Sequence, residues 1–488
     1  MTAPAVRERG TRRDLRGLGR LTWLLVGSQA AFNVGFFVVL PYLAAHLSGT
    51  IGLAGWLVGL VLGLRTFSQQ GLFVVGGVLT DRFGPRPVVL IGCVLRVAGF
   101  VWLAAAQGTG PIIAAVLLIG FAAALFSPAV ETEIARQAVR HEQATGTPRT
   151  RVLALFSVAG QAGTLVGPPL GALLLLGGFP AACLAGAAVF TVVLAAHLRW
   201  MPRGAPDEGS HGANGAGANT GAGHGSHGDG PLGETDGGVH TGDGDRSYGD
   251  GSHGDGSYGD GSYGDASRGA TDDRAHGTPG GTTARGRPRM GEGVRALLSH
   301  RPFLLLCLAY SGYLLAYNQL YLALPEEVER ATGSQTALGW LLAWGSLLYV
   351  LVQMPVLRWI GDRLSRRAVL RSGLLLLALG FAAAAALMPA TAVGGLLPSA
   401  VFVTALTLGQ VLIVPTVRAW VPDLVDGARL GLFTGALSSA SGLAVLLGSM
   451  PAGALVDRGG PAAWLVMAAV PLAAAVFVPR PPSTGGRQ

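Results

Sequence analysis

Long apolar runs alternate with short polar segments along this chain. Each run has about 20 to 28 residues, enough at about 1.5 Å rise per residue to cross a hydrocarbon core of about 30 Å as a helix. Gly and Pro recur inside the runs, as membrane helices tolerate. The pattern predicts twelve spanning helices in two groups of six, near residues 21–47, 52–79, 87–106, 110–135, 151–177, 180–199, 302–325, 335–360, 367–388, 393–421, 428–456 and 460–479.

The polar segment between the two groups has a different chemistry. Most of residues 200–301 is rich in Gly, Ser, Asp and His and holds almost no aliphatic side chains. Such a composition cannot bury enough apolar surface to offset the entropy of ordering, and its histidines lack the spacing of a zinc site. We expect a disordered cytoplasmic linker between an N-terminal lobe, residues 21–199, and a C-terminal lobe, residues 302–479. Residues 1–20 and 480–488 form the cytoplasmic ends.

The two groups of runs repeat one another. Aligning Asp81 with Asp362 gives an offset of 281 residues, and aligning Gly171 with Gly453 gives an offset of 282. Two signals far apart in each half therefore agree within one residue. We predict an all-α membrane protein whose twelve transmembrane helices form two six-helix repeats, with a substrate site between the lobes near the membrane midplane.

Composition excludes several classes of protein. Half of the 488 residues are hydrophobic and 13% are charged, whereas about a quarter are charged in ordinary soluble domains. All 35 basic residues are arginine, so the chain has no lysine for a Walker A loop or a Schiff base. No catalytic constellation stands out. We expect no enzyme, no cofactor and no metal site.

Arginine is distributed unequally between alternate loops. The positive-inside rule then places both termini in the cytoplasm of a bacterium, with the chain crossing the inner membrane many times. The basic character thus reports topology and a lipid bilayer as partner, not nucleic acid. The arginine-poor loops hold Arg330 and Arg458. The arginine-rich loops and N-terminus hold Arg7, Arg9, Arg12, Arg13, Arg16, Arg20, Arg82, Arg86, Arg136, Arg140, Arg149, Arg151, Arg363, Arg366, Arg367 and Arg429.

A short charged hinge separates the second and third runs. Asp81 lies on it next to the positive end of the following helix, where a carboxylate is favoured and an arginine can pair across the gap. The hinge is either a conformational latch on the cytoplasmic side or a solvated turn that only sets topology, and we favour the latch. Its residues are Gly77, Asp81, Arg82, Gly84 and Arg86, with Asp362, Arg363 and Arg367 in a degraded second copy.

These residues carry a family resemblance. The hinge pattern Gly77-x-x-x-Asp81-Arg82-x-Gly84-x-Arg86 resembles motif A of the major facilitator superfamily. The pattern Gly163-x-x-x-Gly167-Pro168-x-x-Gly171 resembles motif C, which is associated with the antiporters of that superfamily. The first hundred residues are similar to bacterial multidrug-resistance proteins. The resemblance implies the major facilitator fold and drug:proton antiport.

The fifth run presents one smooth edge. Gly163, Gly167 and Gly171 are spaced four residues apart, which allows close backbone approach, and Pro168 removes a helical hydrogen bond. The edge is either a gating seal or pivot between the lobes or ordinary small-residue packing. We favour the gating role.

The seventh run carries a tyrosine stripe at steps of three, four and four residues, which puts four rings on one helix face. In the resembled fold this helix lines the central cavity, and the stripe would suit aromatic or cationic ligands. The alternative is packing. The predicted cavity residues are Asn33, Arg65, Gln69, Tyr310, Tyr313, Tyr317, Tyr321 and Gln410.

Arg65 and Arg96 are predicted to lie deep in the membrane, where a charge is by default a functional hypothesis. Arg65 either meets an anionic group, biases a nearby acid or binds backbone carbonyls, or it makes a structural bond to Gln69, Asn33 or Gln161. For Arg96 we favour a structural role.

The proton pathway is the weakest part of the resemblance, because no Asp or Glu lies at the centre of a predicted helix. Glu131 and Glu133, after Pro128 in the fourth run, are the best possible proton carriers. Pairing with Arg136 or Arg140 at the interface is the favoured alternative.

Taken together, the sequence predicts a secondary transporter that exports small, mostly hydrophobic compounds by alternating access in exchange for protons. We expect a monomer. The alternatives are an exporter or importer of a specific metabolite or sugar, and a membrane sensor or scaffold that has lost transport.

Overall fold

The computed structural model describes residues 17–202, 297–360, 363–389, 392–424 and 430–479, and the regular structure of these residues is entirely helical. The predicted linker and both chain ends lie largely outside the described residues. The N-terminal lobe consists of α2 (Arg20–Phe37), α3 (Leu40–Ala45), η1 (His46–Thr50), α4 (Gly55–Gln70), α5 (Phe73–Phe83), α6 (Pro85–Ala105), α7 (Thr109–Thr145), α8 (Arg149–Leu174), η2 (Leu175–Gly177) and α9 (Phe179–Trp200).

The C-terminal lobe repeats this order with fewer interruptions. It consists of α11 (Arg301–Thr332), α12 (Thr336–Ile360), α13 (Arg366–Leu387), η4 (Ala392–Gly395), α14 (Leu397–Leu424), α15 (Leu430–Arg458) and α16 (Gly460–Val476). In the described residues, eleven helical segments are long and apolar enough to cross a membrane, and α16 is a shorter apolar helix of 17 residues. The predicted count of twelve membrane helices in two sets of six is confirmed.

Two membrane helices of the N-terminal lobe are interrupted. The first breaks between α2 and α3, just before Pro41, which occupies the first turn of α3. The second breaks between α4 and α5 at Gly71, whose amide donates to the Phe67 carbonyl oxygen at 2.7 Å. The turn from α5 to α6 depends on Gly84, since its φ of 81° favours glycine, and Pro85 begins the next helix.

The fourth membrane helix is longer than its apolar run. The sequence predicted an end near residue 135, but α7 continues to Thr145 and stops at Gly146, which has a φ of 71°. Polar pairs one turn apart support the extension, such as Gln137, which donates to Glu133 at 2.7 Å. The prediction was wrong by about three turns because it followed hydrophobicity alone.

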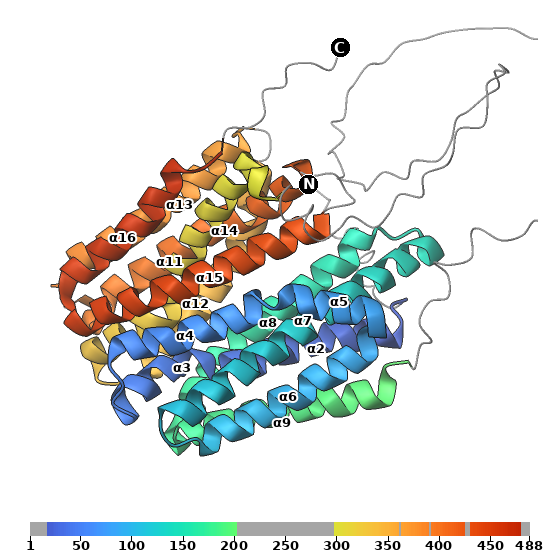
Figure 1. Cartoon of the computed structure of the whole chain (residues 1–488), viewed down its shortest axis with the longest axis horizontal. Coiled ribbons are helices and arrows are strands. Elements are labelled where there is room, and N and C mark those ends of the chain that lie inside the picture. The colour runs from blue at the N-terminus through green and yellow to red at the C-terminus, as the bar shows by residue number, and fades with distance from the viewer. Residues whose placement is uncertain (1–16, 203–296, 361–362, 390–391, 425–429, 480–488) are drawn as a thin grey trace, which may run out of the picture. The chain divides into compact units, whose positions relative to one another are not determined.

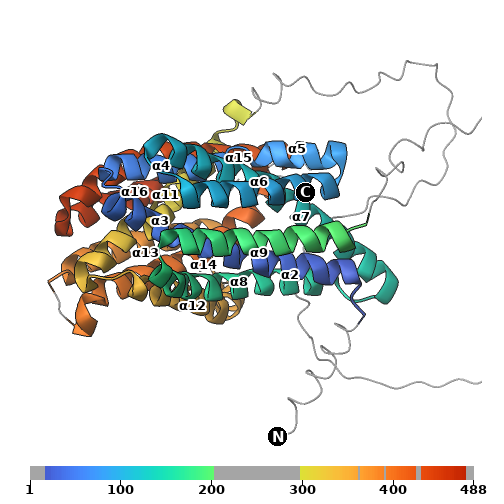
Figure 2. The same ribbon diagram turned by 90° about the horizontal axis from the view of Figure 1, so that it is seen from below.

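The helices pack lengthwise within each lobe. In Figure 1 the blue to green helices of the N-terminal lobe lie together, as do the yellow to red helices of the C-terminal lobe. The lobes meet mainly where α4 packs against α15, as Figure 1 shows, and where α8 packs against α12, as Figure 2 shows, and α3 also packs against α11.

Glycines make the closest contact between the lobes. Gly55, Gly59 and Gly63 follow one edge of α4 at intervals of four residues. A Cβ on Gly59 would overlap the carbonyl oxygen of Ser449 on α15, and Gly453 of α15 lies equally close to Gly55. We call this contact the glycine seam. It brings two backbones together, as small residues do between membrane helices.

The seam belongs to one end of the helix bundle, which we call the Asp457 end. There the Gly55 amide donates to Asp457 at 2.7 Å, and the Ser48 hydroxyl donates to Glu326 at 3.2 Å. Both hydrogen bonds join one lobe to the other. The hinge of Asp81 lies at the opposite end, which we call the Asp81 end.

Candidate functional site

A cavity of about 130 Å³ lies between the lobes, in the middle of the bundle. Helices α2 and α8 of the N-terminal lobe and α11, α12 and α14 of the C-terminal lobe contribute to its wall. We call it the central cavity. Its lining is aromatic and polar but uncharged in the described residues, with Asn33, Phe37, Gln161, Thr164, Pro168, Tyr317, Leu320, Tyr321, Leu342, Gly345, Ser346, Tyr349, Val403, Thr407 and Gln410.

The predicted tyrosine stripe forms a continuous row along α11. Ring centroids of successive tyrosines are 5.4 Å, 5.9 Å and 5.9 Å apart from Tyr310 to Tyr321. The hydroxyls of Tyr317 and Tyr321 are 3.4 Å apart, and these two residues line the central cavity. Tyr310 and Tyr313 continue the row toward the Asp81 end without lining the cavity.

Arg65 lies one layer behind the cavity wall. Its side chain is buried, donates through Nη2 to the Gln69 side-chain oxygen at 2.7 Å, and stacks 4.5 Å from the centre of the Phe36 ring. Of the three predicted amide partners, the structure shows Gln69. The guanidinium is also within electrostatic range of Tyr317 and Tyr321. Arg65 and Gln69 therefore support the cavity rather than line it.

Arg96 is enclosed by aromatic rings. Its guanidinium carbon lies 4.6 Å, 5.1 Å, 5.7 Å and 5.0 Å from the ring centres of Phe32, Phe36, Phe100 and Phe190. Nη1 donates to the Ile119 carbonyl oxygen at 3.1 Å, and the side chain is 1% exposed. Four π faces and a carbonyl stabilise a cation in place, which supports the favoured structural role.

The two predicted proton carriers lie in different surroundings. Glu133 is buried, accepts from Gln137 and lies 4.0 Å from Arg136, so it has the structural pairing that we favoured. Glu131 is exposed, yet it is within electrostatic range of Arg418 on α14 of the other lobe. Arg418 is exposed too. These opposite charges are exposed side chains of different lobes, on the part of α7 and α14 nearer the Asp81 end.

Arg418 was not predicted from the sequence, although a signal existed. Pro128, any residue, Val and then Glu131 in α7 correspond to Pro415, any residue, Val and then Arg418 in α14, at an offset of 287 residues. The loop before α14 is longer than the loop before α7, which explains the change from the offset of 281. An acid and a base thus occupy matching positions in the fourth helix of each lobe.

Other polar lining residues were missed because each is isolated in an apolar run. Ser346 and Tyr349 are three residues apart on α12 and therefore share a helix face, which was the one available signal. Gln161 was predicted only as a partner of Arg65, and Thr407 was not predicted.

The charged hinge at the Asp81 end forms no hydrogen bond or ion pair between the lobes within the described residues. Asp81 and Arg82 are exposed, and Asp81 has no hydrogen bond or ion pair with the described part of the chain. Arg86 donates to the Leu198 carbonyl oxygen of α9, in its own lobe, at 3.2 Å. A methyl group on Gly77 would meet nothing within 4 Å, so the contribution of Gly77 is not one of close packing.

The second copy of the hinge is only partly described. Asp362 lies outside the described residues. Arg363 stacks 5.6 Å from the Trp359 ring, and Arg367 is half-buried at the start of α13. Their neighbour Arg366 joins α13 to the end of α14 through Asp423 and the Ala419 carbonyl oxygen.

The glycine edge of α8 faces its own lobe. Methyl groups on Gly163, Gly167 and Gly171 would meet α2, Phe37 and Val38 respectively, so the edge packs on the first membrane helix. The expected contact with the other lobe is made at Pro168 instead. Its carbonyl oxygen accepts from Tyr42 at 2.5 Å and lies against Gly339 of α12.

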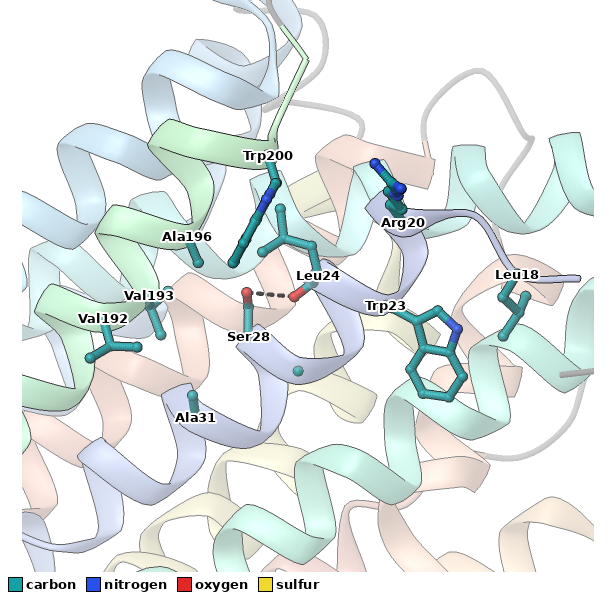
Figure 3. A pocket seen from close by; sticks show the side chains of 11 residues that line it. Leu18, Arg20, Trp23, Leu24, Ser28, Ala31, Val192, Val193, Ala196 and Trp200 are labelled. Carbon is teal, nitrogen blue, oxygen red and sulfur yellow. Dashed lines mark hydrogen bonds between the residues drawn. The ribbon is translucent and has the colours of Figure 1, made fainter. Parts of the chain in front are cut away.

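A larger groove of about 590 Å³ lies between α2 and α9, away from the central cavity. Figure 3 shows Trp200 and Val193 of α9 opposite Leu24 and Ser28 of α2, with Arg20 nearby. The Ser28 hydroxyl already donates a hydrogen bond to the Leu24 carbonyl oxygen at 2.6 Å. The groove therefore offers a mainly apolar wall and little specific recognition, and the central cavity remains the candidate site.

Known proteins are similar to this chain in sequence. It is 42% identical over 194 residues to an uncharacterized MFS-type transporter of Mycobacterium tuberculosis, and the match spans 40% of this chain and 45% of that protein. The chain thus spans less than half the length of that relative. It is 25% identical to the multidrug resistance protein MdtH of Salmonella typhimurium over 446 residues, covering 91% of this chain and 88% of MdtH.

Solved transporters share the fold. The nucleoside transporter NupG matches with a TM-score of 0.63 and 13% identity, over 94% of this chain and 98% of NupG. An auto-inhibited POT family peptide transporter matches with a TM-score of 0.65 and 15% identity, over 94% and 95% of the two chains. The family model of the Major Facilitator Superfamily matches residues 22–326 and 306–488. The chain is a multi-pass membrane protein that belongs to the major facilitator superfamily.

Proposed function

We propose that this transporter exports small, mostly hydrophobic compounds by alternating access, in exchange for protons. The central cavity is the observation that carries the proposal, because five helices from both lobes contribute to it. Similarity to MdtH over most of the chain supports multidrug efflux as the substrate range. The tyrosine row supplies aromatic surface, and Asn33, Gln161 and Gln410 supply hydrogen bonds.

The chain lies in the bacterial inner membrane with both termini in the cytoplasm. The excess of arginine in the loops at the Asp81 end supports this orientation. The seam and the Gly55–Asp457 hydrogen bond then close the periplasmic side. We propose that the lobes separate between the exposed side chains of Glu131 and Arg418, in a cleft that opens to the cytoplasm. This is the conformation that would load a substrate for export.

The return step requires the cytoplasmic cleft to close. Closure brings Glu131 toward Arg418, and the exposed hinge at Asp81 toward the C-terminal lobe as a latch. The tight contact of Pro168 with α12 serves as a pivot, while the seam is the contact that separates. Each contact is consistent with rocking of rigid lobes about a central site.

Glu131 is the proposed proton carrier. It is the exposed acid of α7, it faces the other lobe, and its charge interacts with Arg418, whereas Glu133 is held inside its own helix. A protonated Glu131 loses its attraction for Arg418, so proton binding would favour the open cleft. Proton release toward the cytoplasm would favour closure.

A matched pair of variants in proteoliposomes tests this assignment. Glu131→Gln should retain exchange of labelled for unlabelled substrate and should lose accumulation driven by a proton gradient. Glu142→Gln is the control, because Glu142 lies near the end of α7 beside Arg149 and away from the cleft. Gradient-driven accumulation in Glu131→Gln equal to the control would remove Glu131 from the mechanism.

A further inference from the structure

The charges around the central cavity are unevenly placed. The cavity wall is uncharged in the described residues, but two cations lie just outside it. Arg65 is within electrostatic range of Tyr317 and Tyr321. Arg418 is within range of Tyr349 and Tyr310. The tyrosine row therefore runs between two positive groups.

The positive charge of Arg418 is better compensated than that of Arg65. Glu131 carries an opposite charge within its range, and both side chains are exposed, so water screens them. This pair contributes little net field at the cavity.

Arg65 lacks such compensation. It is 7% exposed, and its hydrogen bond goes to Gln69, a neutral amide. Within the described residues, Arg65 forms no ion pair with a carboxylate, and its Nε has no hydrogen-bond partner. One aromatic ring, that of Phe36, faces the guanidinium. A buried cation with neutral partners keeps most of its external field.

Arg96 strengthens the same field. It lies within electrostatic range of Arg65, and its partners are four phenylalanine rings and a carbonyl group, all neutral. These partners stabilise the cation without cancelling its charge. The N-terminal lobe thus holds two buried positive charges within range of each other, of which Arg65 lies behind the cavity wall, and the low dielectric extends their reach.

We propose that the compounds bound in the central cavity are aromatic organic anions, with the acidic group at the Arg65 side and the ring against Tyr317 and Tyr321. This inference rests on the proposed export function and narrows its substrate class. The tyrosine faces would attract a cation, but no acid lines the described cavity wall to support one, and Arg65 opposes it.

Three ligands with one two-ring body test the charge preference. They are naphthalene-2-carboxylate, neutral naphthalene-2-carboxamide and 2-naphthylmethylammonium, titrated by calorimetry into the purified full chain in detergent. We expect the carboxylate to bind about tenfold more tightly than the ammonium compound, because the charge of Arg65 attracts the first ligand and repels the second through a medium of low dielectric.

Variants at one position assign the preference. Arg65→Gln should bring the carboxylate and ammonium affinities within about threefold of each other, and Arg65→Lys should keep most of the difference, because it retains the charge. Binding of the neutral carboxamide serves as the control for an intact cavity in both variants. Arg418→Gln should leave the difference within about threefold of wild type.

The outcomes separate this inference from the export function. Equal or tighter binding of the ammonium compound by wild type overturns the inference, as does a preference unchanged in an Arg65→Gln variant that still binds the carboxamide. Vesicle accumulation of the ammonium compound without the carboxylate would do the same and leave export standing. A carboxylate preference in a chain that transports none of the three would contradict export alone. Failure of all three to bind contradicts both.

Discussion

The backbone amide of Gly55, in the first turn of α4, donates a 2.7 Å hydrogen bond to the carboxylate of Asp457, in the last turn of α15. The bond joins the two lobes, and it places an anion at the positive end of a helix, where it is favoured. Just beyond it, the glycine seam allows α4 and α15 to touch through their backbones. This end of the bundle must separate if the central cavity is to open on the periplasmic side.

Removing the Asp457 carboxylate should loosen that end. Asp457→Ala deletes an acceptor whose contribution is about 1 kcal/mol in this partly exposed position, so the open population at this end should rise roughly fivefold. Asp457→Asn keeps an acceptor and should give a smaller change. Spin-label distances between the ends of α4 and α15 measure the shift. Identical distance distributions in wild type and Asp457→Ala would show that the bond does not hold the lobes.

A single methyl group should disturb the glycine seam. Gly59→Ala places a Cβ on the Ser449 carbonyl oxygen, which neither backbone can avoid without moving. We expect a transport rate reduced at least about fivefold, with the chain still inserted. Gly27→Ala on α2 is the control, because nothing lies within 4 Å of its Cβ position. Equal transport by both variants would count against close approach at the seam.

The aromatic cage makes Arg96 sensitive to geometry. Arg96→Lys keeps the charge but loses the planar group that reaches four rings and the Ile119 carbonyl oxygen, so it buries a poorly compensated ammonium. Arg96→Met removes the charge and fills similar space. Thermal unfolding in detergent should therefore show a lower melting temperature for Lys than for Met. The reverse order, with transport kept only by Lys, would indicate that the charge acts in transport.

The segment between the lobes should be dispensable for transport. Residues 205–285 lie outside the described residues, and their composition cannot form a packed core. Deleting them should leave the transport rate within about twofold of wild type, because the remaining linker still joins the lobes. A control measurement of membrane insertion accompanies the rate. Lost transport in a correctly inserted deletion would give this segment an active role.

Much of the fold was predictable because membrane helices are encoded by the length of apolar runs. The orientation of small residues was not predictable, since glycines spaced four apart occur on both α4 and α8. The glycine edge of α8 was predicted as the seal between the lobes, yet that edge packs on α2, and the glycine edge of α4 meets the other lobe. The spacing of residues along a helix defines which of them share a face, but not which other helix packs against that face.

The candidate site was predicted only in part, because helical periodicity can be seen in the sequence whereas the packing of one helix on another cannot. The row from Tyr310 to Tyr321 follows from helical periodicity. The contrast between Glu131 and Glu133 does not, because the two differ in which lobe they face, a property of tertiary packing. Arg418 was not predicted, because its match to Glu131 appears only when the longer loop before α14 is allowed for.

Accumulation of a hydrophobic fluorescent compound in inverted membrane vesicles, with and without an imposed proton gradient, tests the central claim most directly. If this transporter exports such compounds in exchange for protons, vesicles that contain it should accumulate the compound when the interior is acidic and should release it when the gradient is dissipated. Accumulation that is unchanged after the gradient is dissipated would contradict proton exchange, and no accumulation beyond that of vesicles lacking the protein would contradict export.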